Sequence, residues 1–115
     1  MIQATTPTVI LTLPDTIDLT TAQEIYVSFR QRSAPLSTNP YSNVLTKTLG
    51  DDVWLTGTHQ INVYLSQTET LAFEPCKAVE VQVNWLTAGG DREATLIETL
   101  KVSDNILDEV IPSEL

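Results

Sequence analysis

Apolar and polar residues alternate with a period of two along most of the chain. In the clearest case, residues 78–87, three valines and Trp85 occupy every second position from Val79 onward. The same alternation appears in TVILTL at 8–13, EIYVSFR at 24–30 and INVYLS at 61–66. Because successive side chains of a strand point to opposite faces, these segments are predicted to be half-buried strands of an antiparallel sheet.

Three further segments complete the predicted sheet. They are two shorter strands, VLTKTL at 44–49 and VWLTG at 53–57, and ATLIETLKV at 94–102, whose phase the pattern leaves open. Short strands joined mostly by short turns indicate an all-β domain. We therefore expect an immunoglobulin-like β-sandwich of about seven short antiparallel strands with one short helix, spanning residues 1–102.

The segments between the strands carry their own signals. Residues 31–43 contain two prolines and several small polar residues, so they are predicted to form a loop. Ser66 followed three positions later by Glu69 is the pattern of a helix capping box, and Pro75 keeps that helix short. Residues 103–115 are predicted to be an acidic tail, whose paired Ile, Leu and Val positions suit an arm that docks on a neighbour.

The segment Thr87–Asp91, TAGGD, admits two interpretations. A phosphate-binding loop needs a helix that starts directly after it and usually a Gly-Lys-Ser/Thr sequence. Here Gly90 is followed by Asp91, which would repel phosphate, and then by a predicted strand. Two glycines between strands supply the positive φ of a tight turn. We therefore predict a hairpin between strands near 79–87 and 92–102.

Composition adds a strong charge to this picture. The chain has 115 residues, about one domain, and a net charge of −9. Its 17 threonines, 10 valines and 8 isoleucines reinforce the bias toward strands. An acidic chain repels nucleic acids and anionic membranes, so neither is expected as a partner. The N-terminus has no basic region or long apolar run, so no signal peptide or membrane span is predicted.

Candidate catalytic and metal-binding groups are few. Cys76 and His59 are the single cysteine and histidine, and the sequence leaves a spatial Cys–His pair open, although a lone cysteine is commonly a small buried hydrophobe. One cysteine forms no internal disulfide, which suits a reducing cytoplasm. Calcium-binding carboxylates would come from the Asp51–Asp52 pair or from the tail cluster of Asp104, Asp108 and Glu109. Neither has the spacing of a calcium-binding loop, so we expect no enzyme, cofactor or metal.

The positions of the large apolar side chains indicate an interaction surface and not a catalytic site. Trp85 shares the phase of the valines on its strand and is assigned to the core. Four others are out of phase with the core positions of their own strands: Tyr26, Trp54, Tyr64 and Leu86. Aromatic residues are enriched in interface centres, so these four are predicted to form a protein–protein interface. A sugar-stacking platform and ordinary exposed aromatics are the alternatives.

ATTPTVILTLP, INVYLSQTETLAF and VEVQVNWLTAGGDREA occur in an order and spacing that resemble small uncharacterised proteins of phages and prophages. The first is similar to a Gly-Thr-Thr-Pro-Thr opening, with Ala4 in place of the usual Gly. The second is similar to a strand followed by Thr-Gln-Glu-x-Thr-Leu, and the third to a Gly-Gly-Asp hairpin. The resemblance covers nearly the whole chain except residues 33–43, which look like an insertion. The N-terminal β-sandwich modules of some siphophage upper-baseplate proteins open in a similar way.

This resemblance implies a non-enzymatic structural component of a bacteriophage particle, and it implies no catalytic residues. The expected role is an interaction module in the tail, baseplate, collar or neck. Its expected partners are other virion proteins, in a homo-oligomer or a larger assembly. Its expected location is the virion, with the host cytoplasm during assembly. The alternatives are a capsid decoration protein and, from a different class, a carbohydrate-binding module for host-surface glycan.

Overall fold

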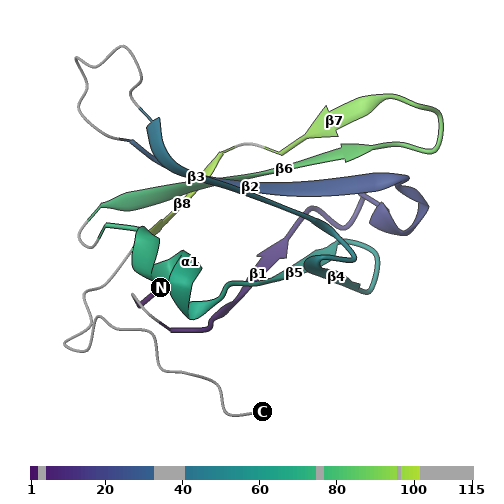
Figure 1. Ribbon diagram of the computed structural model, residues 1–115. Coiled ribbons are helices and arrows are strands. Elements are labelled where there is room, and N and C mark those ends of the chain that lie inside the picture. The colour runs from purple at the N-terminus through teal and green to yellow at the C-terminus, as the bar shows by residue number, and fades with distance from the viewer. Residues whose placement is uncertain (3–4, 33–40, 75–76, 96, 102–115) are drawn as a thin grey trace.

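The computed structural model describes residues 1–2, 5–32, 41–74, 77–95 and 97–101. Within these residues the chain is mostly β-strand (Figure 1). In chain order the elements are β1 (Thr8–Thr12), the 3-10 helix η1 (Leu19–Thr21), β2 (Glu24–Arg32), β3 (Tyr41–Leu49), β4 (Asp52–Thr56), β5 (Gln60–Tyr64), α1 (Gln67–Ala72), β6 (Ala78–Leu86), β7 (Arg92–Ala94) and β8 (Glu98–Lys101). The all-β fold with one short α-helix that the alternation predicted is confirmed.

The strands form one curled, mixed sheet of eight strands in the described part of the chain. Its order is β1-β5-β4-β3-β2-β6-β7, and β8 also pairs with β6, on the edge that β2 does not occupy. We call β1, β5 and β4 the three-stranded half, and β3, β2, β6, β7 and β8 the five-stranded half. Figure 1 shows the two halves facing each other as the layers of a sandwich.

The inward faces of both halves make up the core. On β6 every second residue from Val79 to Trp85 is buried, as the phase of this strand predicted. Burying one such side chain stabilises the fold by about 1.5–3 kcal/mol relative to leaving it exposed. The buried apolar residues form a single cluster: Leu11, Leu13, Leu19, Ile25, Val27, Phe29, Val53, Ile61, Val63, Leu65, Phe73, Val79, Val81, Val83 and Trp85.

The chain passes from the five-stranded to the three-stranded half at a sharp bend between β3 and β4. Gly50 and Asp52 both have positive φ, of 88° and 63°. Glycine adopts this conformation at no steric cost, and aspartate tolerates it better than most residues. Because of the bend, these consecutive strands pair in parallel over two positions. The prediction that all strands are antiparallel is wrong at this pair.

The hairpin and the helix form where the sequence predicted them. Gly90 has a φ of 90°, and the Thr87 N–H donates to the Asp91 carbonyl at 2.8 Å, so TAGGD closes the β6–β7 hairpin. The strand β7, and no helix, follows Asp91. At the start of α1 the Glu69 N–H donates to Ser66 Oγ at 3.2 Å, and the Ser66 N–H donates to Glu69 Oε1 at 2.8 Å. This is the complete capping box.

Two predicted segments have different boundaries. The strand β2 continues through Arg32 and β3 begins at Tyr41, so the loop predicted at 31–43 is wrong at both ends. The segment predicted as one strand at 94–102 overlaps two, β7 and β8. The tail at 103–115 lies outside the described residues.

At the break between β7 and β8, the hydroxyl of Thr95 takes the place of a backbone carbonyl in the hydrogen bonding between strands. The backbone N–H of Thr95 donates to the Val83 carbonyl at 2.9 Å, as in a regular strand pair. Its Oγ1 accepts from the Val83 N–H at 3.1 Å, where a neighbouring carbonyl would otherwise be the acceptor. The hydroxyl therefore satisfies a backbone donor that the irregular chain path leaves available.

Candidate functional site

Three large apolar side chains are exposed together on the outer face of the three-stranded half. Ile10 of β1 and Trp54 of β4 are both register partners of Asn62 on β5, so these three residues form one row. Tyr64 lies two positions beyond Asn62 and points to the same face. Ile10, Trp54 and Tyr64 have exposed fractions of 57%, 45% and 36%. We call these three residues the outer apolar trio.

Asn62 lies between Ile10 and Trp54 and is buried although it is on an outer face. Neighbouring strands are about 4.8 Å apart, so the larger side chains on both sides cover the shorter amide. Its Nδ2 donates to Thr56 Oγ1 at 2.8 Å and to the Trp54 carbonyl at 3.4 Å. The amide is thus tied to β4, and it holds the strand that carries Trp54 against the strand that carries Tyr64.

The structure does not bring the four predicted interface residues together. Trp54 and Tyr64 belong to the outer apolar trio, whereas Tyr26 and Leu86 lie on the outer face of the five-stranded half. The two faces are on opposite sides of the sandwich (Figure 1). Tyr26 is exposed and Leu86 is half-buried. Alternation showed that these side chains point outward, but it carries no information about which strands are neighbours.

Tyr26 and Leu86 line a surface hollow of about 390 Å³. Tyr26 Oη donates to Glu24 Oε2 at 2.8 Å, and this hydrogen bond raises the pKa of Tyr26 above its ordinary value. Arg92 donates from Nε and Nη2 to Asn84 Oδ1 at 3.3 and 3.2 Å. The lining of the hollow therefore combines the aromatic side chains of Tyr26 and Trp85 with the planar polar side chains of Asn84 and Arg92.

Lys47 is a buried cation at the end of the sandwich next to α1. Its Nζ donates to Asp52 Oδ2 and to Glu69 Oε1, both at 2.8 Å. Burial alone would lower the pKa of Lys47, but the hydrogen bonds to Asp52 and Glu69 outweigh it and hold the pKa above its ordinary value. A lysine held protonated is neither a nucleophile nor a base near neutral pH. Its place between Asp52 and Glu69 ties the β3–β4 bend to α1.

Of the candidate catalytic and metal-binding residues, the structure describes His59 and the Asp51–Asp52 pair. His59 lies in the turn between β4 and β5, where its Nδ1 is 3.1 Å from Thr58 Oγ1. The predictions for Cys76 and for the tail carboxylates fall outside the described residues. Within the described ranges, no group of three or more His, Cys, Asp or Glu side chains is placed to hold a metal ion. None of the helices in those ranges has the length and apolar character needed to cross a membrane.

Ile10 is the member of the outer apolar trio that the sequence reasoning did not select. The signal was present, because Ile10 is out of phase with Val9 and Leu11 just as Trp54 is out of phase with Val53. Only the β1–β5 register shows that Ile10 lies beside Asn62 and in the same row as Trp54.

Comparison of the chain with models of protein families, with curated protein sequences and with solved structures gave no match. The geometry of the two outer faces, together with the sequence resemblance, is therefore the basis for a functional assignment.

Proposed function

We propose that the protein is a non-enzymatic structural component of a bacteriophage particle and acts as a protein–protein interaction module. The observation that carries the proposal is the exposure of the outer apolar trio on one sheet face. Scattered exposed apolar residues are ordinary, but a contiguous apolar patch is typical of an interaction site. A partner that covers the trio gains about 25 cal/mol per Å² of apolar area, before the costs of association.

The setting of this module comes from the resemblance to small phage and prophage proteins. It favours the tail, baseplate, collar or neck of a virion, with capsid decoration as the alternative place. Partners are then other virion proteins or further copies of this chain. A net charge of −9 helps to keep the free protein soluble until its partners cover the trio.

The test compares two substitutions in the trio with one on the opposite face. Trp54→Ser and Tyr64→Ser are expected to weaken assembly by about tenfold or more, because aromatic side chains dominate interface centres. Tyr26→Ser is the matched control and is expected to assemble like the unaltered protein. Assembly is measured by sedimentation of the purified chain, alone and with candidate virion proteins, and by cryo-electron microscopy of any particle that contains it.

Tryptophan fluorescence gives a second measurement on the same samples. Trp54 is 45% exposed and Trp85 is 5% exposed, so a blue shift on assembly reports mainly on Trp54. If the trio variants assemble normally and Trp54 emission is unchanged in the assembled state, the proposed interface is wrong.

A carbohydrate-binding module is the second candidate, and the hollow around Tyr26 is the observation that favours it. Sugars commonly bind to an aromatic ring flanked by planar polar groups, and Tyr26, Asn84 and Arg92 supply such a set. A glycan array probed with the whole protein tests this candidate. Binding that is lost in Tyr26→Ser and retained in Trp54→Ser would favour it, whereas an array without binding would remove it.

A further inference from the structure

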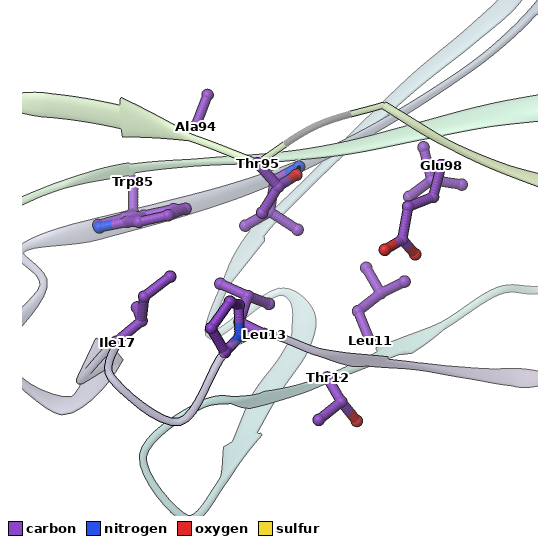
Figure 2. Close-up of a pocket in the computed structure, with 11 residues that line it drawn as sticks. Leu11, Thr12, Leu13, Ile17, Trp85, Ala94, Thr95 and Glu98 are labelled. Atoms are coloured by element: carbon purple, nitrogen blue, oxygen red, sulfur yellow. Dashed lines mark hydrogen bonds between the residues drawn. The ribbon is translucent and has the colours of Figure 1, made fainter.

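An apolar cleft opens along the seam where β1 faces β7 and β8 (Figure 2). Its volume is about 350 Å³, and its walls include Leu11 of β1, Leu13 just after β1, and Val83 and Trp85 of β6. At the opposite seam β3 pairs with β4, whereas β1 pairs only with β5 among the described strands. The sandwich is therefore closed along one seam and open along the other.

Half of the backbone hydrogen-bonding groups of β1 point to this open seam. The Leu13 N–H donates to the His59 carbonyl at 2.8 Å, so the odd-numbered residues of β1 direct their N–H and C=O groups at β5. Successive residues of a strand direct these groups to opposite sides. The groups that point away from β5, where no described strand pairs with them, belong to Thr8, Ile10 and Thr12.

The two strand edges that border the cleft differ in their protection. Edge strands of natural proteins commonly carry charges, prolines or breaks, which discourage pairing with another strand. The β7–β8 edge is interrupted at Thr95 and carries the charged residues Arg92, Glu93, Glu98 and Lys101. The strand β1, TVILT, has no charge and no proline. The edge that remains suited to an added strand is therefore β1.

Carboxylates lie at both ends of the cleft. Figure 2 shows the Glu98 carboxylate turned into the cleft at one end. Beyond Trp85 at the other end, a second hollow of about 170 Å³ is lined by Asp18 and Glu93. No lysine or arginine is among the described residues that line either hollow. The complementary occupant is apolar in its middle and basic at its ends.

We propose that β1 accepts an extended segment of a partner protein as an added strand. Apolar side chains at alternate positions of that segment fill the cleft. Basic residues at its ends meet Glu98 on one side and Asp18 and Glu93 on the other. Backbone hydrogen bonds to the edge of β1 that no described strand occupies supply affinity, and the side chains supply specificity. This extends the proposed interaction function, because it adds a contact made by the backbone edge of β1 and by the cleft. Of the outer apolar trio, only Ile10 lies on that strand.

Two segments of this chain are alternative occupants of the cleft, and both match it less well. The acidic residues 103–115 would bring carboxylates against carboxylates, whether they came from the same copy or from another. A second β1, pairing edge to edge, would bring no basic residue to Glu98. The charges therefore favour a different protein as the source of the segment.

The test uses the full-length, ¹⁵N-labelled protein and synthetic peptides with capped ends. One set alternates valine, leucine or phenylalanine with threonine and has a lysine at each end. A second set replaces the lysines with glutamates. A third keeps the lysines but carries N-methyl groups on alternate backbone nitrogens, which removes the strand donors and leaves the side chains. Binding is followed by NMR titration and by hydrogen exchange of the Ile10 and Thr12 amides.

Peptides flanked by lysine are expected to bind saturably and to slow exchange of the Ile10 and Thr12 amides. Those flanked by glutamate should bind about tenfold more weakly, from the loss of the ion pairs and the added repulsion. N-methylation should abolish binding. Glu98→Lys, an exposed change at the rim, should weaken the lysine peptides and strengthen the glutamate peptides at that end.

Three results would overturn the proposal. The first is that no peptide flanked by lysine binds at millimolar concentration, and the second is that N-methylated peptides bind equally well. The third is strong protection of the Ile10 and Thr12 amides in the free protein, which would mean that this chain already covers the edge. Trp54 and Tyr64 do not take part in the proposed strand addition. Failure of the peptide test therefore leaves the test of the outer apolar trio unaffected, and failure of the trio test leaves the peptide test unaffected.

Discussion

The buried side chain of Gln31 pairs with the backbone of Glu74 as a neighbouring strand would. Gln31 Nε2 donates to the Glu74 carbonyl at 2.9 Å, and Gln31 Oε1 accepts from the Glu74 N–H at 2.8 Å. Gln31 is fully buried on the inward face of β2, where the alternation would place an apolar residue. The side chain therefore connects the end of β2 to the segment between α1 and β6.

Replacing Gln31 with methionine is expected to lower the free energy of unfolding by about 1–3 kcal/mol. The volume is nearly kept, but the N–H and C=O of Glu74 lose their partner, and because Glu74 is an exposed residue, water replaces part of these hydrogen bonds. Urea denaturation measures the change. The control is Gln23→Met, because Gln23 is exposed and its Nε2 donates to Thr87 and Ala88 at the surface. Equal losses in both variants would contradict the assigned role of Gln31.

Lys47→Met should destabilise the protein by about 1–2 kcal/mol at neutral pH. The substitution leaves Glu69 and Asp52 without their cation, and the moderate size reflects their partial exposure to solvent. Adding Glu69→Gln to this variant should recover part of the loss, since the amide needs no counter-ion. A double variant that is no more stable than Lys47→Met alone would contradict this account.

The contribution of Lys47 should also depend on pH. Burial alone would raise the pKa of Glu69, but hydrogen bonds from Lys47 and the Ser66 backbone hold it below its ordinary value of 4.5. Because the pKa of Glu69 is lowered on folding, its carboxylate stabilises the fold above about pH 4.5. This stabilisation is lost as the pH falls through the pKa of Glu69 in the folded protein. Because the pKa of Lys47 is raised on folding, its ammonium group stabilises the fold below about pH 10.5. This stabilisation is lost as the pH rises through the pKa of Lys47 in the folded protein.

The stability gap between the unaltered protein and Lys47→Met should therefore be constant from about pH 5 to 10 and should narrow at both ends. Urea denaturation in a series of buffers measures this gap. Taking the difference between the two proteins removes the general relief of charge repulsion in acid, which both experience. A gap that stays the same at pH 3 would show that the pair contributes no pH-dependent stability.

Gly90→Val should cost roughly 1 kcal/mol or more, because its φ of 90° is strained for any residue with a β-carbon. Gly89→Ala is the matched control. Its φ is not positive, and an added Cβ would meet only Thr87 Oγ1 at 3.9 Å, an ordinary contact. Thermal unfolding should separate the two variants clearly. Identical melting temperatures would mean that the turn tolerates a side chain at either position.

Thr95→Val should lower the free energy of unfolding by about 1–2 kcal/mol, because the Val83 N–H loses the hydroxyl that accepts its hydrogen bond. Faster hydrogen exchange at the Val83 amide is the specific readout. Thr99→Val, on exposed β8, keeps the chemistry of the substitution and should leave that amide unchanged. Unaltered exchange at Val83 in Thr95→Val would show that another acceptor serves this amide.

Much of the fold follows from local signals in the sequence. The alternation on β6, the Ser66–Glu69 capping box and the turn at Gly90 each act within a few residues, so the pattern predicts them. Gln31 was placed in a loop because the prolines that follow it mask the end of β2. The positive φ of Asp52 has no signature in residue type, since most aspartates do not adopt it.

The candidate site was less predictable because it depends on neighbours that are distant in sequence. Ile10 and Trp54 meet only through the two registers of β5, and the period of two carries no register. Glu98 lies in a segment whose phase the pattern left open, so its place at the cleft could not be inferred. The sequence predicts whether each side chain points inward or outward. Which strands, and so which side chains, are neighbours is known only from the folded sheet.

The long-range register has a consequence for how the chain reaches this fold. Val9 pairs with Val63, and Phe29 pairs with Val81, so two of the main strand pairs, β1–β5 and β2–β6, join residues about fifty positions apart. Such contacts carry a large loop-closure cost before they stabilise anything, and sheets of this kind fold in milliseconds to seconds rather than microseconds. On the ribosome β1 emerges long before β5, so this strand, which carries no charge, stays without its pairing partner until β5 has been made.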